Sequence, residues 1–151
     1  MLHQSRRVSL SLCLASVLLM TACQSKSADS TPGTTGTAGT AALRVSDVTL
    51  GRAIGTDKSI SDRTETFRPG DTIYASVATD GSAPNATLRA VWTFEDGQVV
   101  DQSTHTIAPN NRERTEFHIS KPDGWPVGKY KLEVFLNDRS VETKNFEVRA
   151  Q

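Results

Sequence analysis

The sequence places an aspartate, a serine and a histidine at alternate positions of one short stretch, as Asp101, Ser103 and His105. These are the residue types of a hydrolytic triad, which needs hydrogen-bond contact of about 2.6–3.2 Å between neighbouring side chains. Alternate residues of a β-strand share one face, but their side chains stand roughly parallel and about 6.6 Å apart. No Gly-x-Ser-x-Gly turn is present to expose a catalytic serine. We therefore expect a polar strand surface at these positions, and a protein that is not an enzyme.

Metal and nucleic-acid chemistry also find little support in the residue types. The part of the chain after Cys23 has no further cysteine and two histidines, His105 and His118. A zinc site would need two more ligands in tight geometry. The chain has 17 basic and 17 acidic residues, and two of the basic ones, Arg6 and Arg7, lie in the first 22 residues. The rest of the chain is therefore slightly acidic and has no basic stripe, so we expect no nucleic-acid partner. We also expect no metal and no cofactor.

Cys23 stands where an export signal would end. A positive start is followed by an apolar stretch over residues 8–20 and then by two small residues. This is the layout of a secretory signal, and it is too short to span a bilayer. Leu19-Met20-Thr21-Ala22-Cys23 resembles the lipobox of bacterial lipoproteins, although Met20 stands where that family prefers leucine. The alternative is an ordinary cleavage site that is followed by a cysteine by coincidence.

The resemblance to lipoproteins implies a modified N-terminus and a membrane address. Residues 1–22 would be removed, and Cys23 would become the first residue and carry two or three acyl chains. Two chains already give stable anchoring, at roughly 0.8 kcal/mol per buried CH₂. In that family an aspartate after the cysteine retains the protein at the inner membrane, whereas this chain has Gln24. The expected location is the outer membrane, with the domain in the periplasm or exposed at the surface.

The acylated cysteine would be joined to one folded domain by a linker over residues 23–41. Its central part, SKSADSTPGTTGTAGT, has no large apolar residue and is typical of a flexible segment. Such a segment would reach roughly 20–24 Å. Residues 42–151 then have the size of a single domain. Because Cys13 would leave with the signal, this domain has no cysteine to form a disulfide.

Period-two alternation of apolar residues, broken by turn residues, predicts about seven short strands in this domain. They lie around residues 43–54, 73–77, 88–94, 99–105, 115–119, 130–136 and 141–148. The first changes phase near Ser46-Asp47, which predicts a bulge. Asp96-Gly97 predicts a two-residue hairpin loop. In that register Phe94 faces Val99 and Trp92 faces Asp101.

The stretch from Trp125 to Tyr130, together with the strand KLEVFL and the closing Phe146-Glu147-Val148, resembles bacterial immunoglobulin-like envelope domains. The resemblance implies that Tyr130 is the corner tyrosine, whose hydroxyl ties a loop, and that Trp92 is the central core tryptophan. The paired cysteines of antibody domains are absent. The predicted fold is all-β, an immunoglobulin-like antiparallel β-sandwich of about seven strands.

Alternation also leaves some apolar residues facing outward. Val91 and Phe135 point away from the core, on strands that are neighbours in an immunoglobulin-like order, and Tyr74 does the same on another strand. We predict that Val91 and Phe135 belong to an apolar patch that binds a protein partner. The alternative is that single exposed apolar residues are common and need no partner.

The sequence therefore predicts a membrane-anchored envelope lipoprotein whose domain is a non-enzymatic protein-binding or structural module. Its expected partners are the membrane, through the acyl chains on Cys23, and another envelope protein. The alternative is a module that binds a ligand or glycan, or inhibits a hydrolase, through its end loops. Aromatic residues in those loops would favour this alternative, and Trp125 is the one candidate. Its position beside Gly128 and Tyr130 fits core or corner packing better.

Overall fold

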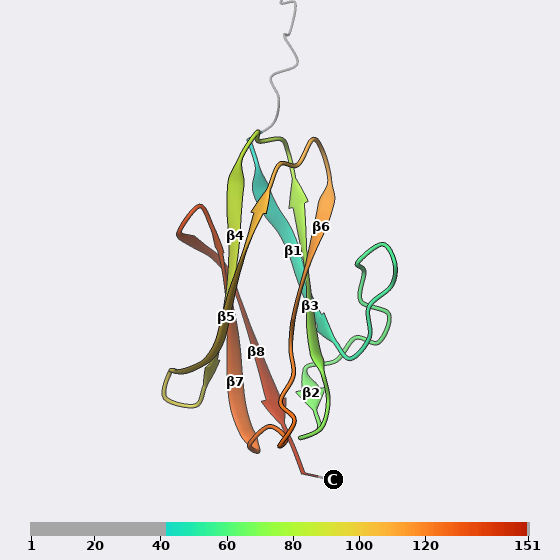
Figure 1. The fold of residues 1–151 in the computed structure, drawn as a ribbon, viewed down its shortest axis with the longest axis vertical. Coiled ribbons are helices and arrows are strands. Elements are labelled where there is room, and N and C mark those ends of the chain that lie inside the picture. Colours follow the sequence, from blue (N-terminus) through green and yellow to red (C-terminus); the bar gives the residue numbers. More distant parts are fainter. Residues whose placement is uncertain (1–41, 151) are drawn as a thin grey trace, which may run out of the picture. The chain divides into compact units, whose positions relative to one another are not determined.

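The computed structural model describes residues 42–150, which form two β-sheets that pack face to face (Figure 1). The predicted export signal, Cys23 and the predicted linker lie outside the described residues. The strands are β1 (Arg44–Gly51), β2 (Thr66–Phe67), β3 (Ile73–Asp80), β4 (Ala86–Phe94), β5 (Gln98–Ile107), β6 (Glu113–Ile119), β7 (Gly128–Leu136) and β8 (Arg139–Val148). Within this part of the chain there is no helix with the length and apolar character needed to cross a membrane.

The two sheets have the strand orders β1-β3-β6 and β2-β8-β7-β4-β5. Neighbouring strands are antiparallel, except that the short β2 pairs with β8 in parallel. The prediction of an all-β, immunoglobulin-like antiparallel β-sandwich is therefore confirmed, with β2 added to seven longer strands. β5 extends the sheet of β4 and β7 instead of joining the three-stranded sheet. Its far edge has no neighbouring strand among the described residues.

Alternation along the strands builds the core between the sheets. The inner-face positions predicted for β3 and β4 are almost completely buried, namely Ile73, Ala75, Val77, Leu88, Ala90 and Trp92. In the same layer Phe146 contacts three other rings. The centroid distances are 5.5 Å to Phe67, 5.8 Å to Trp92 and 5.3 Å to Tyr130. Burial of each large apolar side chain contributes about 1.5–3 kcal/mol, so this layer holds the two sheets together.

The predicted bulge in the first strand is confirmed. The pairing of β1 with β3 shifts register between Val45 and Asp47. The residue between them, Ser46, donates a hydrogen bond from its hydroxyl to the Ala78 carbonyl at 3.2 Å. The bulge lets Val48 and Leu50 face the core although they are out of phase with Val45.

The hairpin between β4 and β5 differs from the prediction by one residue. Its loop contains three residues instead of two, so Phe94 faces Gln98 and not the predicted Val99. A register shift further along β5 compensates for the extra loop residue. Trp92 therefore faces Asp101, as the sequence predicts.

A contact with β7 explains the longer loop. The backbone N–H of Glu95 donates to the Lys129 carbonyl at 2.9 Å, and the Glu95 carboxylate accepts a hydrogen bond from the Lys129 N–H, also at 2.9 Å. These bonds keep Glu95 out of the β4–β5 ladder, with a positive φ of 45°. Gly97, with φ of 102°, then closes the turn.

The polar loop between β1 and β2 packs over the outer face of the three-stranded sheet. The hydroxyl of Ser76 on β3 donates to the Lys58 carbonyl in this loop, and Ser76 and Ala78 are both buried. Gly51 permits the approach, because a Cβ atom there would lie 2.2 Å from the Asp62 carbonyl oxygen. The loop thus covers a sheet face that would otherwise be open.

Candidate functional site

Val91 and Phe135 lie on the adjacent strands β4 and β7, as the sequence predicts. The prediction that Val91 is exposed is wrong, because only 8% of its surface is accessible. It lies on a central strand, with Gln102 of β5 and Glu133 of β7 at the paired positions on either side. Long side chains at these positions leave little of a valine uncovered.

Phe135 is half-buried, and a cation lies over its ring. The guanidinium carbon of Arg89, at the paired position on β4, is 3.9 Å from the ring centroid, which is a cation–π contact. Arg89 also lies 3.8 Å from a carboxylate oxygen of Asp138. Val91 and Phe135 therefore form no open apolar patch, and partner binding through them stays a prediction.

Asp101, Ser103 and His105 lie on the inner face of β5, because they pair with core residues of β4. They lie at the edge of the core, where Asp101 and His105 are exposed and Ser103 is half-buried. Within residues 42–150 no hydrogen bond links the three side chains. The His105 ring instead packs edge-on against Phe117 of β6, with centroids 4.8 Å apart. This geometry gives them no triad contact.

The two histidines do not share a site. His118 points outward from β6, as predicted, with Nδ1 3.1 Å from the Glu116 carboxylate and its ring beside Tyr74. His105 belongs to the other sheet. In the described part of the chain, no group of three or more His, Cys, Asp or Glu residues is placed to hold a metal ion.

The segment before β7 forms the predicted corner. The Tyr130 hydroxyl donates to the Pro126 carbonyl at 2.8 Å. Trp125 is only 6% exposed; its indole N–H donates to the Asp71 carbonyl at 3.0 Å and its backbone N–H to the Pro69 carbonyl at 2.7 Å. The corner role of Tyr130 and the packing role of Trp125 are confirmed. Together the two residues fix the β6–β7 connection.

The surroundings of Tyr130 keep its hydroxyl protonated. Burial, and secondly the negative charge of Glu95, raise the pKa of the Tyr130 hydroxyl above its ordinary value. The ring also packs against Phe94 at a centroid distance of 4.8 Å. Tyr130 therefore acts as a hydrogen-bond donor across the neutral pH range.

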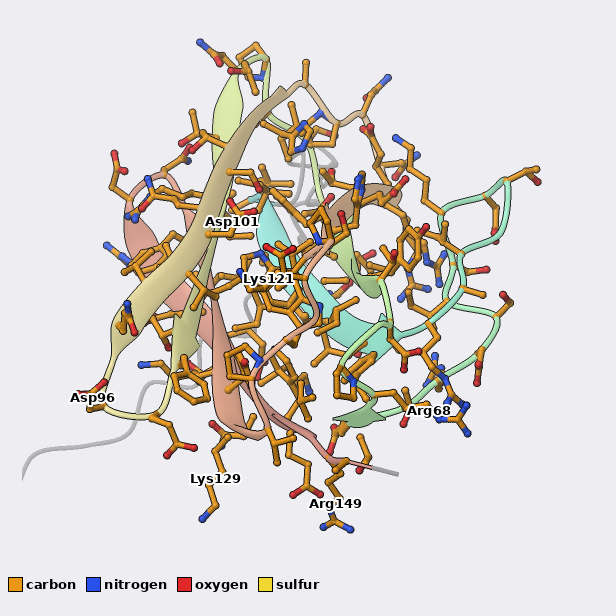
Figure 2. The ribbon with its side chains drawn as sticks, turned by 60° about the horizontal axis from the view of Figure 1, so that its bottom comes forward. Arg68, Asp96, Asp101, Lys121, Lys129 and Arg149 are labelled. Atoms are coloured by element: carbon orange, nitrogen blue, oxygen red, sulfur yellow. The ribbon has the colours of Figure 1, made fainter. Side chains whose placement is uncertain are left out.

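The corner forms one wall of a surface groove, termed the basal groove. The β6–β7 connection that carries the corner lies at the end of the sandwich opposite the start of β1 (Figure 1). The β4–β5 hairpin forms the other wall. The hollow measures about 530 Å³ and is lined by Phe94, Gln98, Val99, Val100, Asp101, Ser120, Lys121, Pro122, Trp125, Pro126 and Tyr130. Figure 2 shows this end of the molecule, with Asp101 on the hairpin wall and Lys121 on the corner wall.

Exposed apolar side chains gather at this groove. The large hydrophobic residues with exposed side chains within residues 42–150 are four valines. Val99 and Val100 line the groove at 56% and 37% exposure, and Val127, at 56%, directly follows Pro126 of the corner wall. The fourth, Val141, lies near Leu43 at the other end. The basal groove thus combines an apolar rim with one acidic and one basic side chain.

The groove is not apparent from the sequence, because the predicted two-residue loop places Val99 opposite Phe94. The signal that could have found it is the pair Val99-Val100. Two adjacent β-branched residues cannot both face the core of an alternating strand. One of them had to be exposed or to sit in a bulge.

The two packed sheets give residues 42–150 an immunoglobulin-like fold. The known proteins to which the chain is similar share this fold at low sequence identity. No protein-family model and no curated protein sequence matches the chain. An immunoglobulin-like protein from Pseudomonas aeruginosa is similar at 20% identity, over 74% of this chain and 99% of that one, with a TM-score of 0.49. A CARDB domain from Pyrococcus furiosus is similar at 11% identity, over 71% and 90%, with a TM-score of 0.40. A DNA glycosylase from Pseudomonas fluorescens is similar at 17% identity, over 68% of this chain but only 30% of that one, with a TM-score of 0.42.

Proposed function

We propose that this chain is an exported lipoprotein, anchored in the outer membrane by acyl chains on Cys23. The support is the lipobox-like sequence around Cys23, the apolar stretch before it, and Gln24 in place of an aspartate. The domain would lie in the periplasm or at the cell surface. A sandwich that is held by an aromatic core and needs no disulfide suits a chain with no cysteine after Cys23.

In this proposal the domain is a non-enzymatic module that binds another envelope protein through the basal groove. The observation that carries it is the pair of exposed valines, Val99 and Val100, that line one hollow, with the exposed Val127 next to the lining residue Pro126. Exposed apolar side chains around a concave site are typical of protein contacts. The expected partner surface offers an apolar side chain for the groove, together with charges that pair with Asp101 and Lys121.

The corner makes the groove a prepared binding site. The hydrogen bonds of Trp125 and Tyr130 hold one wall of the groove in place in the unbound domain. Binding therefore costs less conformational entropy than it would at a free loop. The same geometry disfavours stacking of a sugar ring on Trp125, because that side chain is only 6% exposed.

Site-specific photocrosslinking in intact cells tests the partner site. A photoreactive residue at Val99 should give a discrete protein adduct, and one at Val141, an exposed valine at the other end of the domain, should not. A third probe at Phe135 tests the predicted sheet-face contact separately. No adduct at Val99, or equal adducts at Val99 and Val141, would contradict docking in the basal groove.

Fatty-acid labelling tests the anchor independently of the partner. The full chain should incorporate a labelled fatty acid and fractionate with the outer membrane, and Cys23→Ser should lose both properties. Gln24→Asp should keep the label and move the protein to the inner membrane. Labelling that persists in Cys23→Ser would contradict acylation at this residue.

A further inference from the structure

β5 is a long strand with an open edge. It pairs with β4 along its length, and no strand lies on its other side within residues 42–150. Nearly all of its side chains are exposed. From residue 102 to 106 it reads QSTHT, with no proline, glycine, carboxylate, lysine or arginine. A row of unpaired backbone N–H and C=O groups on such a strand is a template for another strand.

The other three sheet edges carry the protections that natural sheets use. β2 has only two residues, and the part of β8 that it leaves uncovered carries the charged side chains Arg139, Glu142 and Lys144. β1 has a bulge, and its last residue, Gly51, forms a bridge with Arg63 of the adjoining loop. β6 carries charged or ionisable side chains at most of its positions, with the sequence ERTEFHI. Short length, bulges and charges all discourage strand addition, so β5 is the edge that is left open to pairing.

A second copy of this chain satisfies a symmetry condition at this edge. In a two-fold antiparallel pair of β5 strands, residues of the same face must lie opposite each other. The inner-face set is Asp101, Ser103 and His105, and Asp101 is the only acidic residue of the strand. A register that placed Asp101 opposite its own copy would oppose two like charges. With Ser103 on the two-fold axis, Asp101 of each copy instead faces His105 of the other.

We propose that two copies of this chain pair through their β5 edges, antiparallel and centred on Ser103. The pairing joins the two five-stranded sheets into one continuous sheet. Each interface end then places the Asp101 carboxylate opposite the His105 imidazole, which can donate a hydrogen bond to it. Both side chains are exposed in the single domain, so pairing requires no change of the core. On the β5 edge, Asp101, Ser103 and His105 thus form a self-complementary row instead of a catalytic triad.

Cysteine crosslinking of the full chain in intact cells tests this register. Cysteines in Ser103→Cys would lie directly opposite each other, within the range that a disulfide can bridge. Thr106→Cys is the matched control on the same exposed strand, because six positions separate the two cysteines along the strands, roughly 20 Å at about 3.3 Å per residue. Under mild oxidation, Ser103→Cys should give a disulfide-linked dimer and Thr106→Cys should not.

A charge exchange tests the Asp101–His105 contact. In the Ser103→Cys background, His105→Asp should abolish the dimer band because two carboxylates then face each other, and the further change Asp101→His should restore it. No dimer with Ser103→Cys, equal dimer with Thr106→Cys, or no restoration by the exchange would overturn the proposal. A Ser103→Cys adduct with a different protein would overturn it as well. Ser103, His105 and Thr106 do not line the basal groove, so the comparison of Ser103→Cys with Thr106→Cys is separate from the test of that groove.

Discussion

Replacing Tyr130 with phenylalanine removes a single hydroxyl group and tests the energy of the corner. That hydroxyl donates to the Pro126 carbonyl at 2.8 Å, from a ring that is 3% exposed. A hydrogen bond of this kind contributes a net of about 0.5–1.5 kcal/mol. Pro126 is exposed, so water can replace the lost donor and no unpaired buried acceptor is left. We therefore expect the free energy of unfolding to fall by about 1 kcal/mol.

Urea unfolding followed by tryptophan fluorescence measures this loss, because Trp92 and Trp125 are both buried. The same loss should lower Tm by roughly 4 °C for a domain of this size. Tyr74→Phe is the matched control: it removes the same group from a half-buried ring whose hydroxyl makes no hydrogen bond in the described part of the chain. It should change stability by less than about 0.5 kcal/mol. Equal stability of Tyr130→Phe and Tyr74→Phe would refute the contribution of the corner.

The aromatic layer, the hairpin turn and the Tyr130 hydroxyl each give a further prediction. Phe146→Ala removes the ring that three others contact and should cost about 3–5 kcal/mol, which urea unfolding would show as a large drop in midpoint. Gly97→Ala should lower the free energy of unfolding by about 1–2 kcal/mol because φ there is 102°. Gly70→Ala is the control, because an added Cβ has free space at both positions but Gly70 does not have a left-handed φ, and it should not destabilise the domain. Equal melting temperatures of the two variants would contradict this. In Tyr74→Phe protein, Tyr130 is the sole tyrosine, and its absorbance titration should have a midpoint above 10. The folded state holds this proton more tightly than the unfolded chain, so stability is full below pH 10 and falls as pH rises through the folded pKa, a decline that Tyr130→Phe should lessen.

The features that local sequence predicts well are those set by alternation and by turn chemistry. Ile73, Ala75 and Val77 needed only a period of two to be assigned to the core, and they are buried. The bulge near Ser46 follows from a phase change within one strand. The corner role of Tyr130 came from a resemblance at the level of the fold, and its hydroxyl makes the expected bond.

The features that sequence could not predict depend on contacts between distant segments. The hairpin loop has three residues because Glu95 bonds to Lys129 of β7, far along the chain. Val91 is buried through the side chains of two neighbouring strands, which alternation within its own strand cannot show. The basal groove joins a hairpin to the β6–β7 connection, so its shape exists only after the sheets have packed.

The opposite placement of the start of β1 and the basal groove has a mechanical consequence. β1 begins at the end to which the predicted tether would attach, and the groove lies at the other end (Figure 1). A pull between a membrane and a protein held in the groove would act along the strands. Such tension would strain the hydrogen bonds between β1 and β3, which span seven residue pairs, all together in shear instead of unzipping them one at a time. The antiparallel pairing of its first strand would therefore let the domain carry tension between an anchored end and a bound partner.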